Sequence, residues 1–134
     1  SSSAGRKLPS DRLRIMKGNT KVMGNIKIVD VEEAEVYEES TLVSRRVIRK
    51  THGAQSMSFN VTTLHEGYED TNVIYPDHDE IVYILSGKIE FSTDGSTQVL
   101  GPGKAIYIPR GEEYGYKVIT GPNEVIAVFT PGKF

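Results

Sequence analysis

The chain has 134 residues, of which 37% are hydrophobic and 25% charged, a composition typical of one globular domain. Sixteen Lys and Arg against eighteen Asp and Glu give a net charge of -2, so the positive surplus that binds nucleic acid or an anionic membrane is lacking, and we expect neither partner. The absence of cysteine excludes disulfides, thiolate metal sites and a thiol nucleophile.

The first 20 residues form a segment of their own. They carry five basic side chains without a regular apolar pattern, and the three opening serines resemble a cloning remnant. We expect a flexible basic tail over residues 1–20 and a single β-barrel domain over residues 21–134. No stretch approaches the roughly 20 apolar residues of a membrane span, and the tail lacks the apolar core of a signal peptide. The cytoplasm is therefore the expected location.

From Val22 onward, short apolar runs alternate with turn residues, and no 3.6-residue period is sustained. This pattern predicts an all-β fold. The acidic run at residues 32–39 predicts a solvated edge or a short helical turn. Asp94-Gly95 lies between two alternating runs and predicts a tight hairpin, because its turn type needs positive φ at both central residues. Strands are expected at residues 24–31, 43–50, 56–64, 71–75, 80–86, 87–93, 96–100, 105–108, 113–119 and 124–130.

The run Glu-Ile-Val-Tyr-Ile-Leu at residues 80–85 is apolar on both faces apart from its first residue. Glu80 shares one face with Val82 and Ile84, and we expect that face to point into the barrel. A bare buried carboxylate costs several kcal/mol, so it needs a cation, hydrogen bonds or a proton. Glu80 is therefore a candidate site residue.

The opposite face of this run carries Ile81, Tyr83 and Leu85. An outward apolar face must be covered, and the chain shows no clear helix that would cover it. We expect a homodimer formed sheet to sheet through this face. The alternative is a monomer in which residues 8–40 fold over it.

Two motifs resemble those of the cupin superfamily, in particular its small single-domain RmlC-like members. Glu80, six residues and Gly87 match the end of the first cupin motif. Gly103, five residues and Pro109-Arg110-Gly111 match the second. The resemblance implies the double-stranded β-helix, or jelly-roll, barrel of that superfamily.

Cupins usually hold a divalent metal with a His-x-His pair, the first-motif glutamate and a second-motif histidine. In this chain Asn72 and Ile74 are matched to the histidine pair, and Tyr114 falls where the second-motif histidine would be. Three of the four usual ligands are thus missing. A barrel without metal is therefore one alternative.

Within the superfamily, residues 55–130 resemble ectoine synthase, a cupin that closes an acyclic acetylated diamino acid by losing water. The resemblance implies a divalent metal, with iron as the candidate, held by Glu80 and Tyr107, with Tyr75 nearby. The second-motif histidine of that family is absent here. The matching positions are residues 56–63, Gly67, Tyr75, His78, Glu80, Val82, Tyr83, Ser86, Gly87, Asp94, Gly95, Pro102, Gly103, Tyr107, Ile108, Val128 and Phe129.

The residues themselves also suggest a site. Tyr107 alternates with Ile106 and Ile108, so it can point inward when they point outward. A carboxylate with a phenolate is a hard ligand set that favours iron, manganese or magnesium. The alternative is that the tyrosines, including Tyr75 and Tyr114, fill the barrel with their hydroxyls at a wet mouth.

Two further groups carry charge near this region. His78 lies among carboxylates and is a candidate general acid or base, with Tyr75 and Tyr114 as further catalytic candidates; the alternative for His78 is a loop residue that faces water. A basic strand could place one cation over the pocket, although a solvated face is the preferred interpretation. Its residues are Arg45, Arg46, Arg49 and Lys50.

Three functions remain open at this point. The leading hypothesis is a metal-assisted lyase, cyclase or dehydratase that acts on a small polar metabolite; the metal would polarise the substrate and a tyrosine or His78 would move the proton. The second is a cupin that binds a small ligand without catalysis, resembling the ethanolamine-utilisation cupins. The third is an enzyme that uses His and Tyr without metal.

Overall fold

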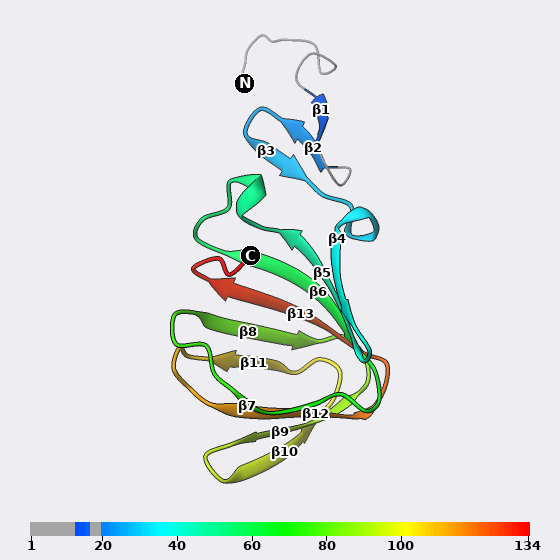
Figure 1. The fold of residues 1–134 in the computed structure, drawn as a ribbon, viewed down its shortest axis with the longest axis vertical. Helices are drawn as coiled ribbons and strands as arrows, with labels where there is room; N and C mark the ends of the chain where they lie inside the picture. The colour runs from blue at the N-terminus through cyan, green and yellow to red at the C-terminus, as the bar shows by residue number, and fades with distance from the viewer. Residues whose placement is uncertain (1–12, 17–19) are drawn as a thin grey trace.

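The computed structural model describes residues 13–16 and 20–134 (Figure 1). A small antiparallel sheet of order β1-β2-β3 lies beyond one end of the barrel and consists of β1 (Leu13–Met16), β2 (Thr20–Met23) and β3 (Ile26–Ile28). A part of the expected tail therefore forms strand β1. The rest of the tail, residues 1–12 and 17–19, lies outside the described residues.

Two larger antiparallel sheets form the barrel. The six-stranded sheet has the order β11-β8-β13-β6-β5-β4 and consists of β11 (Ala105–Ile108), β8 (Asp79–Ile84), β13 (Asn123–Thr130), β6 (Ser58–Leu64), β5 (Leu42–Ile48) and β4 (Glu35–Glu39). The four-stranded sheet has the order β10-β9-β12-β7 and consists of β10 (Ser96–Leu100), β9 (Lys88–Thr93), β12 (Tyr114–Thr120) and β7 (Glu69–Val73). The predicted all-β jelly-roll barrel is confirmed.

Helical structure is confined to two short 3-10 turns, η1 (Val31–Glu33) and η2 (Lys50–His52), among the residues described. Within that part of the chain, no helix has the length and hydrophobicity needed to cross a membrane. The acidic run forms η1 and then β4, the exposed edge strand of the larger sheet. Both structures expected for this run are therefore present.

Two predicted turns depend on backbone conformations that few residues adopt. Asp94 and Gly95 have φ of 50° and 75°, and they connect β9 to β10 with Thr93 opposite Ser96. Gly87 has φ of 81°, and a Cβ there would lie 2.6 Å from the Thr120 carbonyl oxygen. The glycine that ends the first motif is thus required by both conformation and close packing.

The core lies between the two barrel sheets and follows from strand alternation. On β8, Val82 and Ile84 are buried, whereas Ile81 and Tyr83 on the other face are 47% and 40% exposed. The neighbouring β13 and, in the other sheet, β12 also alternate, with their buried residues facing the interior. This alternation confirms the predicted inward face of the segment that begins at Glu80.

Candidate active site

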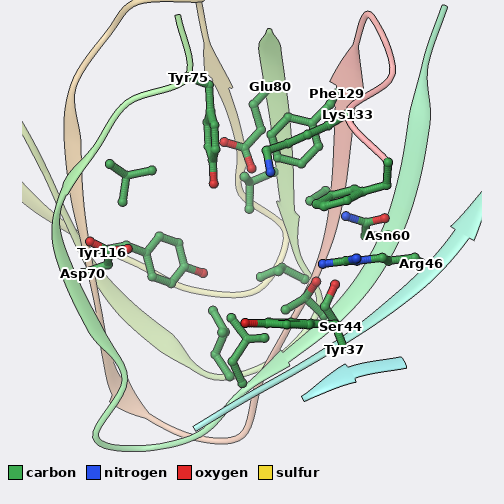
Figure 2. A pocket seen from close by; sticks show the side chains of 18 of the residues that line it. Tyr37, Ser44, Arg46, Asn60, Asp70, Tyr75, Glu80, Tyr116, Phe129 and Lys133 are labelled. Carbon is green, nitrogen blue, oxygen red and sulfur yellow. The ribbon is translucent and has the colours of Figure 1, made fainter. Parts of the chain in front are cut away.

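The barrel interior contains a cavity of about 440 Å³ (Figure 2). Side chains of β4, β5, β6, β7, β8, β12 and β13 line it together with residues from the segments before β7, before β8 and after β13. Figure 2 shows Glu80, Tyr75, Phe129 and Lys133 gathered on one part of the wall. The lining residues are Tyr37, Leu42, Ser44, Arg46, Asn60, Thr62, Leu64, Tyr68, Asp70, Val73, Tyr75, Glu80, Val82, Tyr114, Tyr116, Val125, Ala127, Phe129, Lys133 and Phe134.

Glu80 is the buried acid of this cavity. Its side chain begins the inward face of β8 and is 5% exposed, and its Oε1 accepts a 2.9 Å hydrogen bond from the Tyr114 hydroxyl. Burial raises the pKa of Glu80 to about 7, although the bond from Tyr114 and the charge of Lys133 partly oppose this rise. Near neutral pH, Glu80 is therefore present in both its protonated and its ionised form.

Two tyrosines border Glu80. Burial, followed by the nearby charge of Glu80, raises the pKa of Tyr75 to about 12 and the pKa of Tyr114 still further. The Tyr114 ring stacks on Phe91 at 5.2 Å between centroids, and the Tyr75 ring meets Phe129 edge-on at 5.1 Å. Both phenols are thus held in fixed positions as neutral hydroxyls, which donate hydrogen bonds and do not supply phenolate.

Two cations line the cavity as well. The Lys133 ammonium lies 4.3 Å from the ring centroid of Phe134 and 5.2 Å from that of Tyr75, and burial lowers the pKa of this lysine. The Arg46 guanidinium lies 4.1 Å from the centroid of Phe134. Within the described residues, neither cation lies at ion-pair distance from a carboxylate. Aromatic faces therefore hold both cations and leave their N–H groups available.

The family model described as "Cupin domain" matches residues 60–129, slightly more than half of the chain. This chain belongs to the cupin domain family. The match begins at the cavity-lining Asn60 and ends at the cavity-lining Phe129. A search of curated proteins found no significant match.

Solved structures agree with this assignment. Ectoine synthase from P. lautus superimposes with a TM-score of 0.72 and 25% identity, over 79% of this cupin and 78% of that chain. KdgF from Halomonas sp. superimposes with a TM-score of 0.68 and 21% identity, over 76% of this cupin and 92% of that chain. The polyketide cyclase RemF from Streptomyces resistomycificus superimposes with a TM-score of 0.67 and 23% identity, over 79% of each chain. This cupin therefore resembles ectoine synthase as well as other small cupins.

Not all of the predicted site residues meet in the cavity. Glu80, Tyr75 and Tyr114 line it, as expected. Tyr107 does not: its side chain is 63% exposed and lies opposite Ile81 on the outer face of β8 and β11. The prediction that Tyr107 points inward is wrong because Ile106 and Ile108 take the inward positions of that strand.

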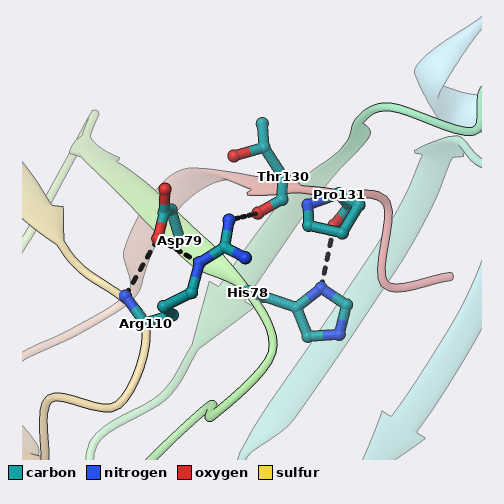
Figure 3. Close-up of polar contacts among 5 residues, drawn as sticks. All are labelled: His78, Asp79, Arg110, Thr130 and Pro131. Carbon is teal, nitrogen blue, oxygen red and sulfur yellow. Dashed lines mark hydrogen bonds and ion pairs between the residues drawn. The ribbon is translucent and has the colours of Figure 1, made fainter.

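His78 is half-buried and is not a lining residue of the cavity. Its Nδ1 lies 2.8 Å from the Pro131 carbonyl oxygen, so it donates a hydrogen bond there (Figure 3). Its ring meets that of Phe129 edge-on, with 6.1 Å between the centroids. The residue precedes the first residue of β8, where the chain has not yet entered the sheet. The structure thus places His78 against the turn after β13 and not among the residues that line the cavity.

The donor set around Glu80 does not fit a divalent metal. Tyr107 faces away, and no group of three or more His, Asp or Glu among the described residues is arranged to hold a metal ion. Glu80 would offer one carboxylate, with two neutral phenols beside it and the Lys133 charge nearby. Asp70 also lines the cavity, but it is paired in register with Tyr116 and lies beside it in Figure 2. A proton fits this environment better than a divalent cation does.

Sequence reasoning missed two functional candidates and ranked a third too low. For Arg46 it prefers a solvated basic face to a cation over the pocket, but Arg46 alternates with the inward Leu42 and Ser44 and lines the cavity. Asn60 follows the same rule on β6, between the inward Ser58 and Thr62. Lys133 lies beyond the last strand, so no periodic pattern placed it; a bond from its backbone N–H to Ser58 Oγ (3.1 Å) helps to place it.

Proposed function

We propose that this cupin is a lyase or cyclase that acts on a small polar carboxylate by proton transfer, with Glu80 as the acid and base. The observation that carries the proposal is the buried Glu80 with a pKa of about 7, bonded to Tyr114 at the wall of a cavity of about 440 Å³. A general acid or base works best when its pKa lies near the operating pH. The name of one similar structure, a polyketide cyclase, indicates ring formation, and the resemblance to ectoine synthase implies ring closure with loss of water; both support this class of reaction.

The chemistry requires two proton transfers. When a hydroxyl leaves as water, it must accept one proton, and a C–H or N–H of the substrate must lose one; where a carbonyl oxygen leaves, the attacking N–H first supplies the proton that makes it a hydroxyl. Protonated Glu80 supplies the first proton, and the resulting carboxylate accepts the second, so that Glu80 returns to its starting state with one water released. The Tyr114 hydroxyl stabilises the carboxylate between the two transfers through its hydrogen bond to Oε1.

The cavity also suits the size and polarity of such a substrate. Its wall combines aliphatic residues such as Leu64 and Val125 with the cations Arg46 and Lys133. Burial of the substrate excludes water, and this strengthens every electrostatic contact to the reacting atoms. Glu80 and the cations therefore act on the same bound molecule.

The test is a substrate panel followed by proton NMR. It contains small hydroxy carboxylates and the acyclic acetylated diamino acid that the resemblance to ectoine synthase implies. We expect conversion with loss of water, a rate that depends on a group with pKa near 7, and a fall of at least about 100-fold in Glu80→Gln. Asp79→Asn is the matched control, because Asp79 is the adjacent carboxylate on the other face of β8.

The outcomes separate the candidate functions. Turnover that Glu80→Gln leaves unchanged would contradict the role of Glu80. Saturable binding of panel members without turnover would instead identify a non-catalytic ligand-binding cupin. The two cations of the cavity also support that function, since neither has a carboxylate at ion-pair distance in the described part of the chain.

A further inference from the structure

One part of the cavity wall holds two buried polar atoms without a partner. Arg46 on β5 and Asn60 on β6 are directly paired in register, and both side chains face the interior. The Arg46 Nε and the Asn60 Oδ1 are both buried, and neither has a hydrogen-bond partner among the described residues. Such atoms are rare in folded proteins, because leaving a buried polar group unbonded is unfavourable. A donor and an acceptor therefore lie side by side, and both need a partner.

Lys133 completes this region. Its ammonium lies 4.3 Å from the ring centroid of Phe134, and the Arg46 guanidinium lies 4.1 Å from the same ring. Figure 2 shows Arg46, Asn60 and Lys133 projecting into one side of the cavity. We call these three residues the polar corner. Arg46 and Lys133 carry like charges, and among the described residues neither has a carboxylate at ion-pair distance. An anion bound between them would offset their repulsion.

We propose that the polar corner binds a carboxylate through Arg46 and Lys133. Asn60 Oδ1 then accepts a hydrogen bond from an N–H or O–H group on the carbon next to that carboxylate. The ligands are therefore 2-hydroxy, 2-amino or 2-acylamino carboxylates. A plain carboxylate would satisfy the arginine and the lysine but would leave Asn60 Oδ1 without a donor. The inference rests on the proposed function in one respect, namely that the substrate occupies this cavity.

Lys133 also relates the polar corner to the acid and base. Its charge interacts with Arg46 on one side and with Glu80 on the other. A carboxylate held at the corner therefore places the rest of the substrate beside Glu80. The polar corner orients the molecule, and Glu80 acts on the atoms beyond the anchored group.

The probes are three matched compounds titrated into the full chain and followed by NMR. N-acetylalanine has both the carboxylate and the N–H, its primary amide lacks the charge, and its N-methyl analogue lacks the N–H. We expect N-acetylalanine to bind and each analogue to bind at least about tenfold more weakly, as the loss of a hydrogen bond to a charged or buried group predicts. The side-chain Nε–H signal of Arg46 should shift with N-acetylalanine and not with the amide. Equal binding of the acid and the amide would overturn the proposal.

Variants provide the second arm. Arg46→Gln and Lys133→Met should each weaken N-acetylalanine binding at least about tenfold. Arg45→Gln is the matched control: Arg45 is the next residue on β5, and its Nε is also buried without a partner, but Arg45 does not line the cavity. An equal loss in Arg45→Gln would overturn the proposal. If Arg46→Gln fails to fold, the Arg46 Nε–H signal of the wild type decides the question.

Glu80→Gln separates this inference from the proposed function. It should abolish turnover and, at pH 5, leave N-acetylalanine binding within about twofold, because Glu80 is protonated there and glutamine has the same charge. Turnover of a panel substrate without any N-acetylalanine binding would overturn the polar corner alone. If N-acetylalanine binds more tightly than its two analogues, but Glu80→Gln turns over a panel substrate as fast as the wild type, the proposed function alone would be overturned.

Discussion

Adjacent carboxylates on the two faces of β8 behave in opposite ways. Asp79 faces outward and accepts hydrogen bonds from the backbone N–H and the Nε of Arg110 at 2.9 and 3.0 Å, which lower its pKa (Figure 3). Glu80 faces inward, where burial raises its pKa to about 7. The side of the strand, rather than the residue type, thus determines whether the pKa of the carboxylate lies below its ordinary value or near neutral pH.

The same strand also separates two kinds of apolar surface. The inward Val82 and Ile84 are buried in the core, whereas Ile81 and Tyr83 remain exposed on the outside. The outward Tyr107 of β11 extends this exposed surface, because it lies opposite Ile81. The described parts of the chain leave this face open, and a homodimer through it remains our proposal.

The largest expected effect is on assembly. Ile81, Tyr83 and Leu85 would contribute roughly 4–8 kcal/mol of gross hydrophobic free energy on burial against a second copy, before the entropy of association is subtracted. Tyr83→Glu should therefore convert a dimer into a monomer of 14.8 kDa in light scattering, because the new charge would be desolvated without a partner.

The matched control for assembly is Val99→Glu, which introduces the same charge at an exposed apolar residue of the other sheet. It should leave the dimer intact. A wild-type mass near 15 kDa at every micromolar concentration would contradict the dimer. A dimer that persists in Tyr83→Glu would place the interface on another face.

The second expected effect concerns how Glu80 changes the stability of the fold with pH. The pKa of Glu80 is higher in the folded chain than its ordinary value of 4.5, so the folded state binds the proton more tightly than the unfolded state does. The free energy of unfolding therefore falls as the pH rises from 4.5 to 7. The wild type should lose about 3 kcal/mol relative to Glu80→Gln between pH 4.5 and pH 7, at 1.36 kcal/mol per unit of pKa. Urea unfolding of both proteins at pH 4.5 and pH 8 measures this difference.

Below pH 4.5 the two proteins should be nearly equal in stability, because glutamine resembles the protonated acid and can still accept the Tyr114 hydrogen bond. A constant difference across the whole pH range would show that Glu80 does not titrate between pH 4.5 and pH 7. It would thereby remove the distinction between the two faces of β8.

The third effect is the loss of the hydroxyl that bonds Glu80. Tyr114→Phe should destabilise the fold by about 1 kcal/mol at pH 4.5 and by about 2 kcal/mol at pH 8, because a hydrogen bond to an ionised acceptor is the stronger one. Tyr116→Phe is the control, since the Tyr116 hydroxyl donates to the neutral Asn123 Oδ1 at 2.6 Å. Its loss should not change with pH. Equal pH profiles for the two variants would show that Glu80 has one charge state throughout.

The sequence predicted the inner face of β8 because Glu80 marks its phase among apolar residues. It failed on β11, whose four residues Ala-Ile-Tyr-Ile offer no charged side chain that would distinguish inside from outside. Tyr107 is paired with the outward Ile81, and this pairing fixes which residues of β11 face outward. Strand pairing is a tertiary property that the sequence of β11 alone does not reveal. The polar corner was missed for a related reason, since Arg46 and Asn60 become neighbours only through the register of β5 with β6.

The smallest expected effect is that of Asp79→Asn. The Arg110 contacts hold the folded pKa of Asp79 below its ordinary value of 3.8, so their contribution is complete above pH 3.8 and is lost as the pH falls through the folded pKa. The variant should therefore be less stable than the wild type at pH 6, and the difference should shrink as the pH falls below 3.8. The difference should be smaller than that of Tyr114→Phe and should shrink in 1 M salt, because this ion pair is accessible to solvent. Asp77→Asn, two residues earlier on an exposed turn, controls for the loss of one charge. A difference that grows towards low pH would mean that Asp79 resembles Glu80, and the contrast between the two faces would fail.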